Sequence, residues 1–538
     1  MTTLPPGAAG SLTKRSAATW RNTSTRPLQM LFNSYTFIFI FLPLTLLLFH
    51  GLRRTGFERG SILVLTLMSL VFYGWWNARY LLLLVPLMFA NFAVATRIAP
   101  RGGQRPAAAK PLLMFGLAFN LAALGYFKYA NFFLDNVNSL LGLDLFLEKI
   151  VLPIGISFFI FQKIAFLVDA YDGKVERFNL LDYSLFVAFF PQLIAGPIVH
   201  HSEVMPQFRK AGPVPAEYFA LGITIFMIGL AKKVLFADTA ASYASPQFAA
   251  VATGAKLDLL AAWSAAFAYT AQLYFDFSGY SDMAIGGALL FGIRLPVNFN
   301  SPYKSASIIE FWRRWHISLS RFLRDYLYIP LGGNRKGRTR RYVNLLITML
   351  LGGIWHGAGW TFAIWGALHG LYLTINQAWR MLNEKLGFPS EPSNGLGRRI
   401  GQVTTFLAVV VAWVFFRSEN VSSAVEMLKA MAGDNGITVP ASIAGLAAGF
   451  PKSQGPIDSG IALLVSFFFL VIAWTAPNTQ QLTAYVGPTG VYSSDDETET
   501  EKAGLWKFSP AWAVAVGCLF GVTLLFMTKV SEFIYFQF

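Results

Sequence analysis

Two histidines lie where an imidazole could do chemistry away from water, and the first is His356. Residues 342–379 contain no Asp, Glu, Lys or Arg, and His356 stands within this run in the string GGIWHG at 352–357. Ionisable residues inside a membrane are costly and usually face a cavity or a partner. A neutral imidazole there suits general-base catalysis on a hydroxyl group. The alternative is a packing histidine that bonds a neighbouring carbonyl, with the flanking glycines allowing close helix approach.

A basic cluster upstream of this run indicates how deep His356 lies. The cluster occupies residues 335–341 and predicts a cytoplasmic membrane edge. His356 follows about 15 residues later, which is roughly 22 Å along a helix at 1.5 Å per residue. The hydrocarbon core is about 30 Å thick, so we expect His356 inside the membrane.

The second histidine is His316, in the string EFWRRWHISLSRFLRDY at 310–326. As one continuous helix, this string would place His316 on a face with Trp312, Leu319 and Leu323, while arginines occupy another face. His316 would then point inward as a catalytic or ligand-binding group. A packed core histidine beside an interfacial basic helix is the alternative. We expect His369 to be a packing residue, His200 and His201 to be interfacial or pocket-lining, and His50 to mark a boundary.

The chain carries no familiar soluble-enzyme motif. It has no Walker A string, no GxSxG and no dinucleotide-binding glycine pattern, and no Cys–His spacing predicts a zinc site. The turn Gly332–Gly337 is basic and could cradle phosphates in a nest of backbone N–H groups. The interpretation that we favour is a simple basic turn at the cytoplasmic edge.

The C-terminal string FIYFQF at 533–538 is a third feature that could do chemistry. A free tail is normally polar and frayed, so a tail this apolar needs a groove. Tyr535 brings the string's only hydroxyl group. The alternative is an aromatic anchor at the membrane interface.

Composition places these residues in a polytopic membrane protein. Hydrophobic residues make up 55% of the 538 residues and charged residues only 13%, about half the charge of a soluble protein. The net charge of +15 is concentrated in loops, which fits the positive-inside rule better than nucleic-acid binding. Cys518 is the only cysteine, which excludes disulfides within the chain.

The pattern of charge-free stretches predicts an all-α protein with roughly 11 to 14 membrane segments. The clear stretches are 30–52, 60–78, 80–96, 111–127, 183–202, 259–275, 400–416, 459–476 and 508–528, and shorter ones are 150–162, 218–231 and 283–293. The long run 342–379 could hold two helices broken at its glycines. Two short basic loops, 53–59 and 97–110, are expected on the cytoplasmic side, although the basic residues of the N-terminal tail conflict with this orientation.

Four strings together resemble the membrane-bound O-acyltransferase family, and most closely its bacterial alginate O-acetyltransferase branch. They are YTAQLYFDFSGYSD at 269–282, EFWRRWHIS at 310–318, LRDYLYIPLGGNR at 323–335 and GGIWHG at 352–357. The resemblance divides the chain into a polar tail (1–29), a catalytic core (30–420) and a C-terminal extension (421–538) that contains a flexible loop at about 484–505.

The resemblance implies a ring of helices around a membrane-crossing tunnel, with no bound cofactor and with acetyl-CoA as substrate. By this resemblance His356 is the catalytic residue. His316 is the second histidine of the tunnel and would orient the acceptor or stabilise the oxyanion. Tyr535 would receive the acetyl group and pass it to an extracytoplasmic hydrolase-like transferase outside a bacterial inner membrane. The residues it suggests for substrate binding are Trp312, Trp315, Arg324, Asp325, Asn334 and Trp355.

Other functions stay open from the sequence alone. Broken helices and buried histidines also occur in transporters, and relatives of this family acylate lipids, proteins, peptidoglycan or teichoic acid. The sequence names neither the polymer, such as an alginate-like or cellulose-like chain, nor the acyl donor.

Overall fold

The structure is a computed structural model that describes residues 30–175, 178–209, 212–389, 395–440, 456–488, 504–527 and 533–534. Within these ranges it contains helices and connecting loops and no β-strand, and an isolated bridge joins Arg101 to Gln104. The all-α prediction is therefore confirmed.

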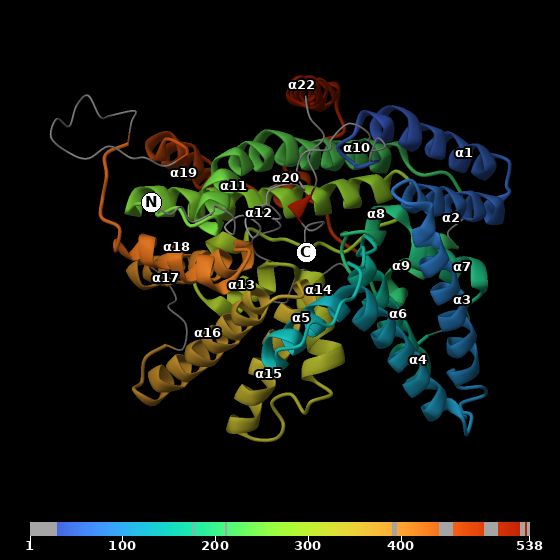
Figure 1. Ribbon diagram of the computed structural model, residues 1–538. Helices are drawn as coiled ribbons and strands as arrows, with labels where there is room; N and C mark the ends of the chain where they lie inside the picture. The colour runs from blue at the N-terminus through green and yellow to red at the C-terminus, as the bar shows by residue number, and fades with distance from the viewer. Residues whose placement is uncertain are drawn as a thin grey trace, which may run out of the picture.

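The N-terminal helices other than α5 pack around an aromatic core on one side of the molecule, and α5 lies nearer its centre (Figure 1). They are α1 (Leu42–Arg54), α2 (Glu58–Gly74), α3 (Leu81–Ile98), α4 (Ala109–Leu124), α5 (Ala130–Leu141), α6 (Ile156–Tyr171), α7 (Leu180–Ala188), α8 (Phe190–Leu193) and α9 (His201–Phe208). A π-helical turn, Gly125–Tyr129, joins α4 to α5 without a break, giving one apolar helix of 33 residues.

Two of the predicted spans end elsewhere than the sequence suggested. The stretch 111–127 was expected to stop before Lys128, but the helix continues to Leu141 with this lysine inside it. The stretch 183–202 is not a span, because the chain breaks at Phe189 and again before Pro197. Residues 183–199 are buried in protein, which is where interrupted backbone is tolerated at membrane depth.

The centre of the fold is α12 (Leu259–Leu289), which is buried along almost its whole length. It packs against α10 (Ala216–Ala231), which continues through a π-helical segment, Lys232–Ala237, into α11 (Asp238–Ala252). A Cβ on Gly229 would lie 2.6 Å from the Gly279 carbonyl oxygen, and one on Gly286 would lie 2.5 Å from that of Gly222. The two backbones therefore touch directly, as small residues allow between membrane helices.

The helices around the two histidines lie below this layer, where α15 and α16 project side by side (Figure 1). They are α13 (Ile308–Arg314), α14 (Ile317–Leu323), the π-helical turn Arg324–Tyr328, α15 (Arg338–His356) and α16 (Trp360–Lys385). The charge-free run 342–379 thus holds two helices that are broken at residues 357–359, as its glycines predicted.

The remaining α-helices of the described chain pack on α10, α12 and α16. They are α17 (Leu396–Arg417), α18 (Val421–Ala432), α19 (Ser459–Thr475), α20 (Thr479–Thr483) and α22 (Pro510–Phe526). The short helix α20 is tied to α12, because Thr479 and Gln480 both donate hydrogen bonds to the Asp282 carboxylate.

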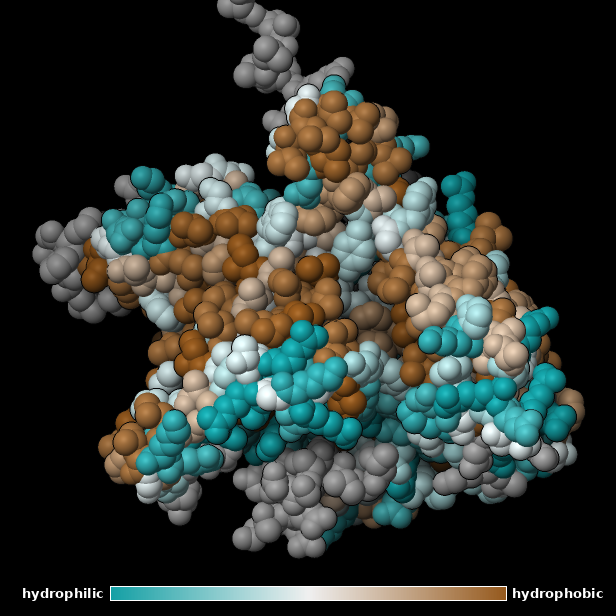
Figure 2. Space-filling view, turned by 90° about the horizontal axis from the view of Figure 1, so that it is seen from below, coloured by the Kyte–Doolittle hydropathy of each residue, from teal (hydrophilic) through white to brown (hydrophobic). Residues whose placement is uncertain are grey.

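The exterior has the character of a multi-pass membrane protein. Large apolar side chains such as Leu47, Leu82 and Leu525 are more than 70% exposed, which a water-soluble surface would avoid. Five described helices are long and apolar enough to cross a membrane, and α19 and α22 are shorter apolar helices. Figure 2 shows broad hydrophobic surfaces separated by bands of hydrophilic side chains.

Candidate active site

His316 interrupts the helix that the sequence predicts over 310–326. The helix α13 ends at Arg314 and α14 begins at Ile317, and between them His316 adopts left-handed backbone angles, φ 43° and ψ 54°. The prediction of one continuous helix, with Trp312 and His316 on one face, is therefore wrong. His316 is nevertheless fully buried, so its inward orientation is confirmed.

Asn298 holds this break in place from a neighbouring loop. Its backbone carbonyl accepts a hydrogen bond from Ile317 N at 3.0 Å. Its side-chain Oδ1 accepts from Ser318 N at 3.2 Å and from Ser318 Oγ at 2.9 Å, and it lies 3.1 Å from His316 Nδ1. A left-handed residue with a side chain costs roughly 1–2 kcal/mol, and these bonds offset that cost.

The same bonds determine which ring nitrogen of His316 carries a proton. Ser318 donates its backbone N–H to Asn298 Oδ1, so this atom is the amide oxygen and can only accept. His316 Nδ1 must therefore be the donor in the bond that joins it to Asn298. In a neutral imidazole, Nε2 then bears a lone pair and accepts hydrogen bonds.

His356 is the last residue of α15 and is buried at the end of that helix. Its ring packs against Trp355, Trp365 and Phe416, with centroid distances of 4.9, 5.0 and 5.3 Å. The helix stops here because Gly357 turns to an extended backbone. A Cβ on Gly357 would lie 2.2 Å from the Phe362 ring, so this turn has no room for a side chain.

Glycines bring α15 and α16 into backbone contact next to His356. A Cβ on Gly353 would lie 2.4 Å from the Phe362 carbonyl oxygen, and one on Gly366 would lie 2.4 Å from that of Met349. Gly353, three residues before His356, therefore has the helix-packing role that the sequence allowed for it.

The structure brings the two histidines together. The ring centroids of His316 and His356 are 6.5 Å apart. Phe277 from α12 and Phe158 from α6 pack on His316, at 4.7 and 6.4 Å. Two imidazoles from separate strings thus face one apolar region at the meeting point of α6, α12, α14 and α15.

The predicted substrate-binding residues divide into two groups. Trp355 lies at the site, stacked on Phe161 at 5.0 Å and touching His356. Trp312 and Trp315 belong to the aromatic core behind it, where Trp312 Nε1 donates to His369 Nδ1 at 3.3 Å. This bond and its aromatic neighbours fit the packing role expected of His369.

The polar members of the predicted set lie away from the histidine pair. Arg324 is exposed and pairs with Asp325 next to it, through bonds of 2.7 and 3.1 Å. Asn334 is exposed in the turn after the π-helical segment. Their role in binding substrate therefore stays a prediction.

A chain of aromatic rings connects His356 to a buried polar cluster. Trp355 stacks on Phe161, Phe161 on Phe322 at 4.3 Å, and Phe322 packs against Tyr326 at 5.0 Å. The Tyr326 hydroxyl donates to Asp169 at 2.6 Å.

His200 and His201 both belong to this cluster around Asp169. The Nδ1 atom of His201 lies 3.4 Å from the Asp169 carboxylate. Burial lowers the pKa of His200, and the Arg321 guanidinium lowers it further. The two histidines therefore belong to a buried polar cluster, and their role in lining a pocket stays a prediction.

Phe533 and Ile534, the two described residues of the C-terminal string, are buried in the core. Phe533 packs edge-on against Tyr280 at 4.4 Å, with the Lys233 ammonium 4.8 Å from its ring centroid. Ile534 N donates to the Asp276 carboxylate at 3.0 Å. Asp276 directly precedes Phe277, the residue that packs on His316. Tyr535 itself lies outside the described residues.

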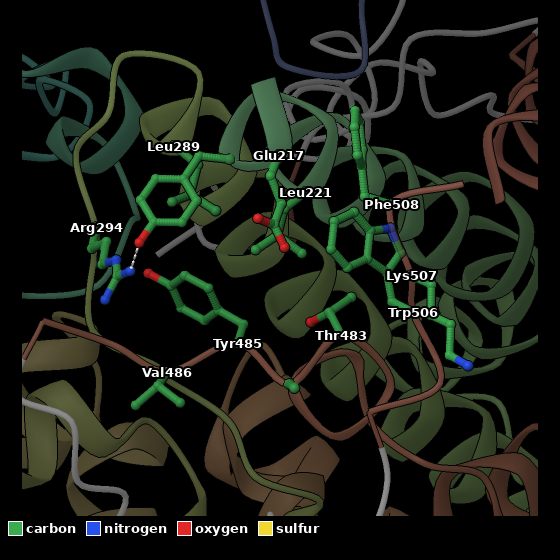
Figure 3. Close-up of a pocket in the computed structure, with 12 residues that line it drawn as sticks. Glu217, Leu221, Leu289, Arg294, Thr483, Tyr485, Val486, Trp506, Lys507 and Phe508 are labelled. Atoms are coloured by element: carbon green, nitrogen blue, oxygen red, sulfur yellow. Dashed lines mark hydrogen bonds between the residues drawn. The ribbon is translucent and has the colours of Figure 1, made fainter. Parts of the chain in front are cut away.

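A separate cavity of about 530 Å³ opens at the C-terminal end of α12. Figure 3 shows the Glu217 carboxylate between Tyr485 and Trp506, with Arg294 donating to the Tyr218 hydroxyl. Leu289, which lines this cavity, lies 12 residues beyond Phe277, or roughly 18 Å along the helix. The cavity is therefore distinct from the histidine site.

Sequence reasoning missed two residues that hold the site. Asn298 lies in an ordinary loop string and gave no signal. Lys128 did give one, because it is a charge within an otherwise apolar stretch, but it was interpreted as the end of a span. Its Nζ donates to the carbonyl oxygens of Trp355 and His356, at 2.6 and 2.8 Å.

Comparison with known proteins gives consistent matches. Residues 142–395 match the membrane-bound O-acyltransferase family. The chain is 45% identical to a peptidoglycan O-acetyltransferase of Helicobacter pylori, over 76% of this chain and 81% of that protein. It is 47% identical to a probable alginate O-acetylase of Pseudomonas aeruginosa, over 75% of each. A teichoic acid D-alanyltransferase of Streptococcus thermophilus is 30% identical, over 49% of this chain and 68% of that protein.

Proposed function

This chain belongs to the membrane-bound O-acyltransferase family, and we propose that it passes acetyl groups from cytoplasmic acetyl-CoA across a bacterial inner membrane for O-acetylation of a secreted or cell-surface polysaccharide. Two relatives with more than 40% identity are described by name as acting on peptidoglycan and alginate, which supports a polysaccharide as the final acceptor. The observation that carries the proposal is the buried pair His316 and His356, at 6.5 Å between ring centroids.

In the proposed reaction His356 is the general base. It takes the proton of an acceptor hydroxyl as that oxygen attacks the carbonyl carbon of the acetyl thioester. The carbon–sulfur bond then breaks, and the leaving thiolate takes the proton back from the imidazole. The products are an acetyl ester and free coenzyme A, so atoms and charges balance.

The protonation of His316 supports one of its two expected roles over the other. With its proton on Nδ1, a neutral His316 accepts a hydrogen bond at Nε2 and can orient the acceptor hydroxyl. It has no proton on Nε2 to offer to an oxyanion.

Donors for the oxyanion are available from two tryptophans instead. Trp355 and Trp365 both pack on His356, and their indole N–H groups are buried without an acceptor among the described residues. Fixed donors of this kind stabilise the charge that develops on a tetrahedral intermediate.

We assign the acceptor hydroxyl to Tyr535. The two residues before it are held in the core, Phe533 by Tyr280 and Ile534 by Asp276. The chain therefore reaches the elements that surround His316 just before Tyr535. A phenol is a better leaving group than a sugar alcohol, since its pKa is about 10, so the acetyl-tyrosine could pass its group to an extracytoplasmic hydrolase-like transferase.

The test compares histidine variants in cells that depend on this protein for polymer acetylation. We expect His356→Ala to lower the base-labile acetate of the polymer by about 10²- to 10⁴-fold, the usual effect of losing a general base. We also expect a strong loss for His316→Ala. The control is His50→Ala, since His50 bonds the Leu290 carbonyl at 2.9 Å and packs on Phe49 and Phe219, away from the histidine pair. Normal acetylation by a well-expressed His356→Ala protein would refute the assignment.

A further inference from the structure

The π-helical turn between α4 and α5 carries two side chains that reach the end of α15. Lys128 Nζ donates to the carbonyl oxygens of Trp355 at 2.6 Å and His356 at 2.8 Å, and it lies 3.4 Å from Ser157 Oγ. The neighbouring Tyr129 hydroxyl donates to the Ile354 carbonyl at 2.9 Å. Adjacent residues of one turn thus bind three consecutive carbonyls.

These carbonyls are the ones that a helix end leaves without partners. The last four C=O groups of an α-helix have no intrahelical donor, and α15 ends at His356 inside an apolar region. The C-terminal end of a helix also carries partial negative charge, which a cation stabilises. Lys128 and Tyr129 therefore supply the hydrogen-bond donors that allow a helix to stop there.

The same segment also holds the far side of the turn. Trp360 is the first residue of α16, and its Nε1 donates to Asn136 Oδ1 on α5 at 2.8 Å. Phe132 packs edge-on against the Trp360 ring at 6.0 Å. Residues 128–136 thus contact both ends of the three-residue turn 357–359.

We propose that Lys128 is a positioning residue for the reaction, acting through the backbone of His356. Its ammonium group fixes the carbonyls at the end of α15, and with them the direction in which the His356 imidazole points. Because Trp355 is held in the same way, the indole next to His356 is placed at the same time. This inference rests on the proposed function, in which His356 is the general base.

The experiment compares four variants at matched protein levels. Lys128→Met removes the donor and keeps the length of the side chain, Lys128→Arg restores a cationic donor, and Tyr129→Phe removes one bond. The control is Lys110→Met, which removes an exposed lysine at the start of α4. Two quantities are measured: the base-labile acetate of the cell polymer, and kcat and KM for acetyl-CoA in membrane vesicles.

We expect Lys128→Met to lose about 10- to 100-fold in polymer acetate and in kcat, with KM for acetyl-CoA within about twofold of the wild type, because a misplaced catalytic group costs rate at unchanged binding. Lys128→Arg should recover most of the loss, and Lys110→Met should match the wild type.

Three outcomes would overturn the inference: a normal kcat for Lys128→Met, a raised KM at constant kcat, or Lys128→Arg as inactive as Lys128→Met. If the Lys128→Met protein does not accumulate, Tyr129→Phe decides the question. A reduced kcat at constant KM would support the inference, and a wild-type kcat would contradict it. If His356→Ala is inactive while Lys128→Met is fully active, only this inference is refuted. If His356→Ala is active, the proposed function is refuted.

Discussion

The bonds between Asn298 and His316 predict a large loss of activity from one small change, Asn298→Ala. The variant keeps the backbone bond from Ile317 N to residue 298, so the break between α13 and α14 should survive. It removes the side-chain oxygen that receives His316 Nδ1–H and both donors of Ser318. The imidazole is then free to turn and to move its proton between the two nitrogens.

The structure gives the size of the effect. Leaving a buried donor without a partner costs about 1–3 kcal/mol, and the His316 ring and Ser318 N each lose an acceptor. Rotation of the ring can recover part of this cost, so we expect a loss of about 2–4 kcal/mol in the free energy of unfolding. For activity, losing the correct tautomer and orientation should cost about 10²-fold, equivalent to roughly 2.7 kcal/mol at 1.36 kcal/mol per tenfold change.

The matched control is Ser281→Ala. Ser281 Oγ accepts from Asn298 Nδ2 at 3.3 Å, so this variant disturbs Asn298 while keeping the bond to His316. Polymer acetate per amount of membrane protein, together with the unfolding temperature in detergent, measures both effects. Equal acetylation in Asn298→Ala and Ser281→Ala would refute the view that Asn298 sets the state of His316.

Three further predictions concern the relay, the oxyanion and the orientation. Tyr535→Phe keeps the apolar tail but should abolish acetyl export, and the wild type incubated with acetyl-CoA should carry one acetyl group on its C-terminal peptide; full polymer acetylation by the variant would exclude the relay. Trp355→Phe should lose about 10²- to 10³-fold in kcat, as oxyanion donors do, whereas Trp413→Phe, stacked behind Trp365 at 5.6 Å, should not. In a Cys518→Ser background, cysteines at Gln104 and Thr339 should react only from the cytoplasmic side, and labelling from outside intact cells would reverse the proposed direction of acetyl flow.

The sequence predicted the parts of this fold that depend on local pattern. Apolar runs predicted helices, and glycines predicted both the close contact of α15 with α16 and the break between them. The strings around His316 and His356 also indicated that both rings lie inside the protein. Each of these inferences uses residues within a few turns of one another.

The features that were missed depend on contacts across the chain. The break at His316 is held by Asn298, which lies 18 residues earlier in a loop without a distinctive pattern. Lys128 donates a hydrogen bond to the carbonyl oxygen of His356, which lies 228 residues later in the chain. A charge at the edge of an apolar stretch is an ambiguous sign, because the end of a span and a buried charge with a partner give the same pattern.

Three interruptions of regular helix meet at the candidate site, and their meeting is itself an argument for function. The end of α15, the left-handed residue between α13 and α14, and the π-helical turn at 125–129 all expose backbone or polar groups in an apolar environment. Irregular backbone at membrane depth survives only where protein or a cavity surrounds it. Here Asn298 holds the break at His316. Lys128 and Tyr129 bind the carbonyl oxygens at the end of α15, where His356 lies. A fold selected only for packing would have continued these helices, so the cost of interrupting them points to the histidine pair as the site of chemistry.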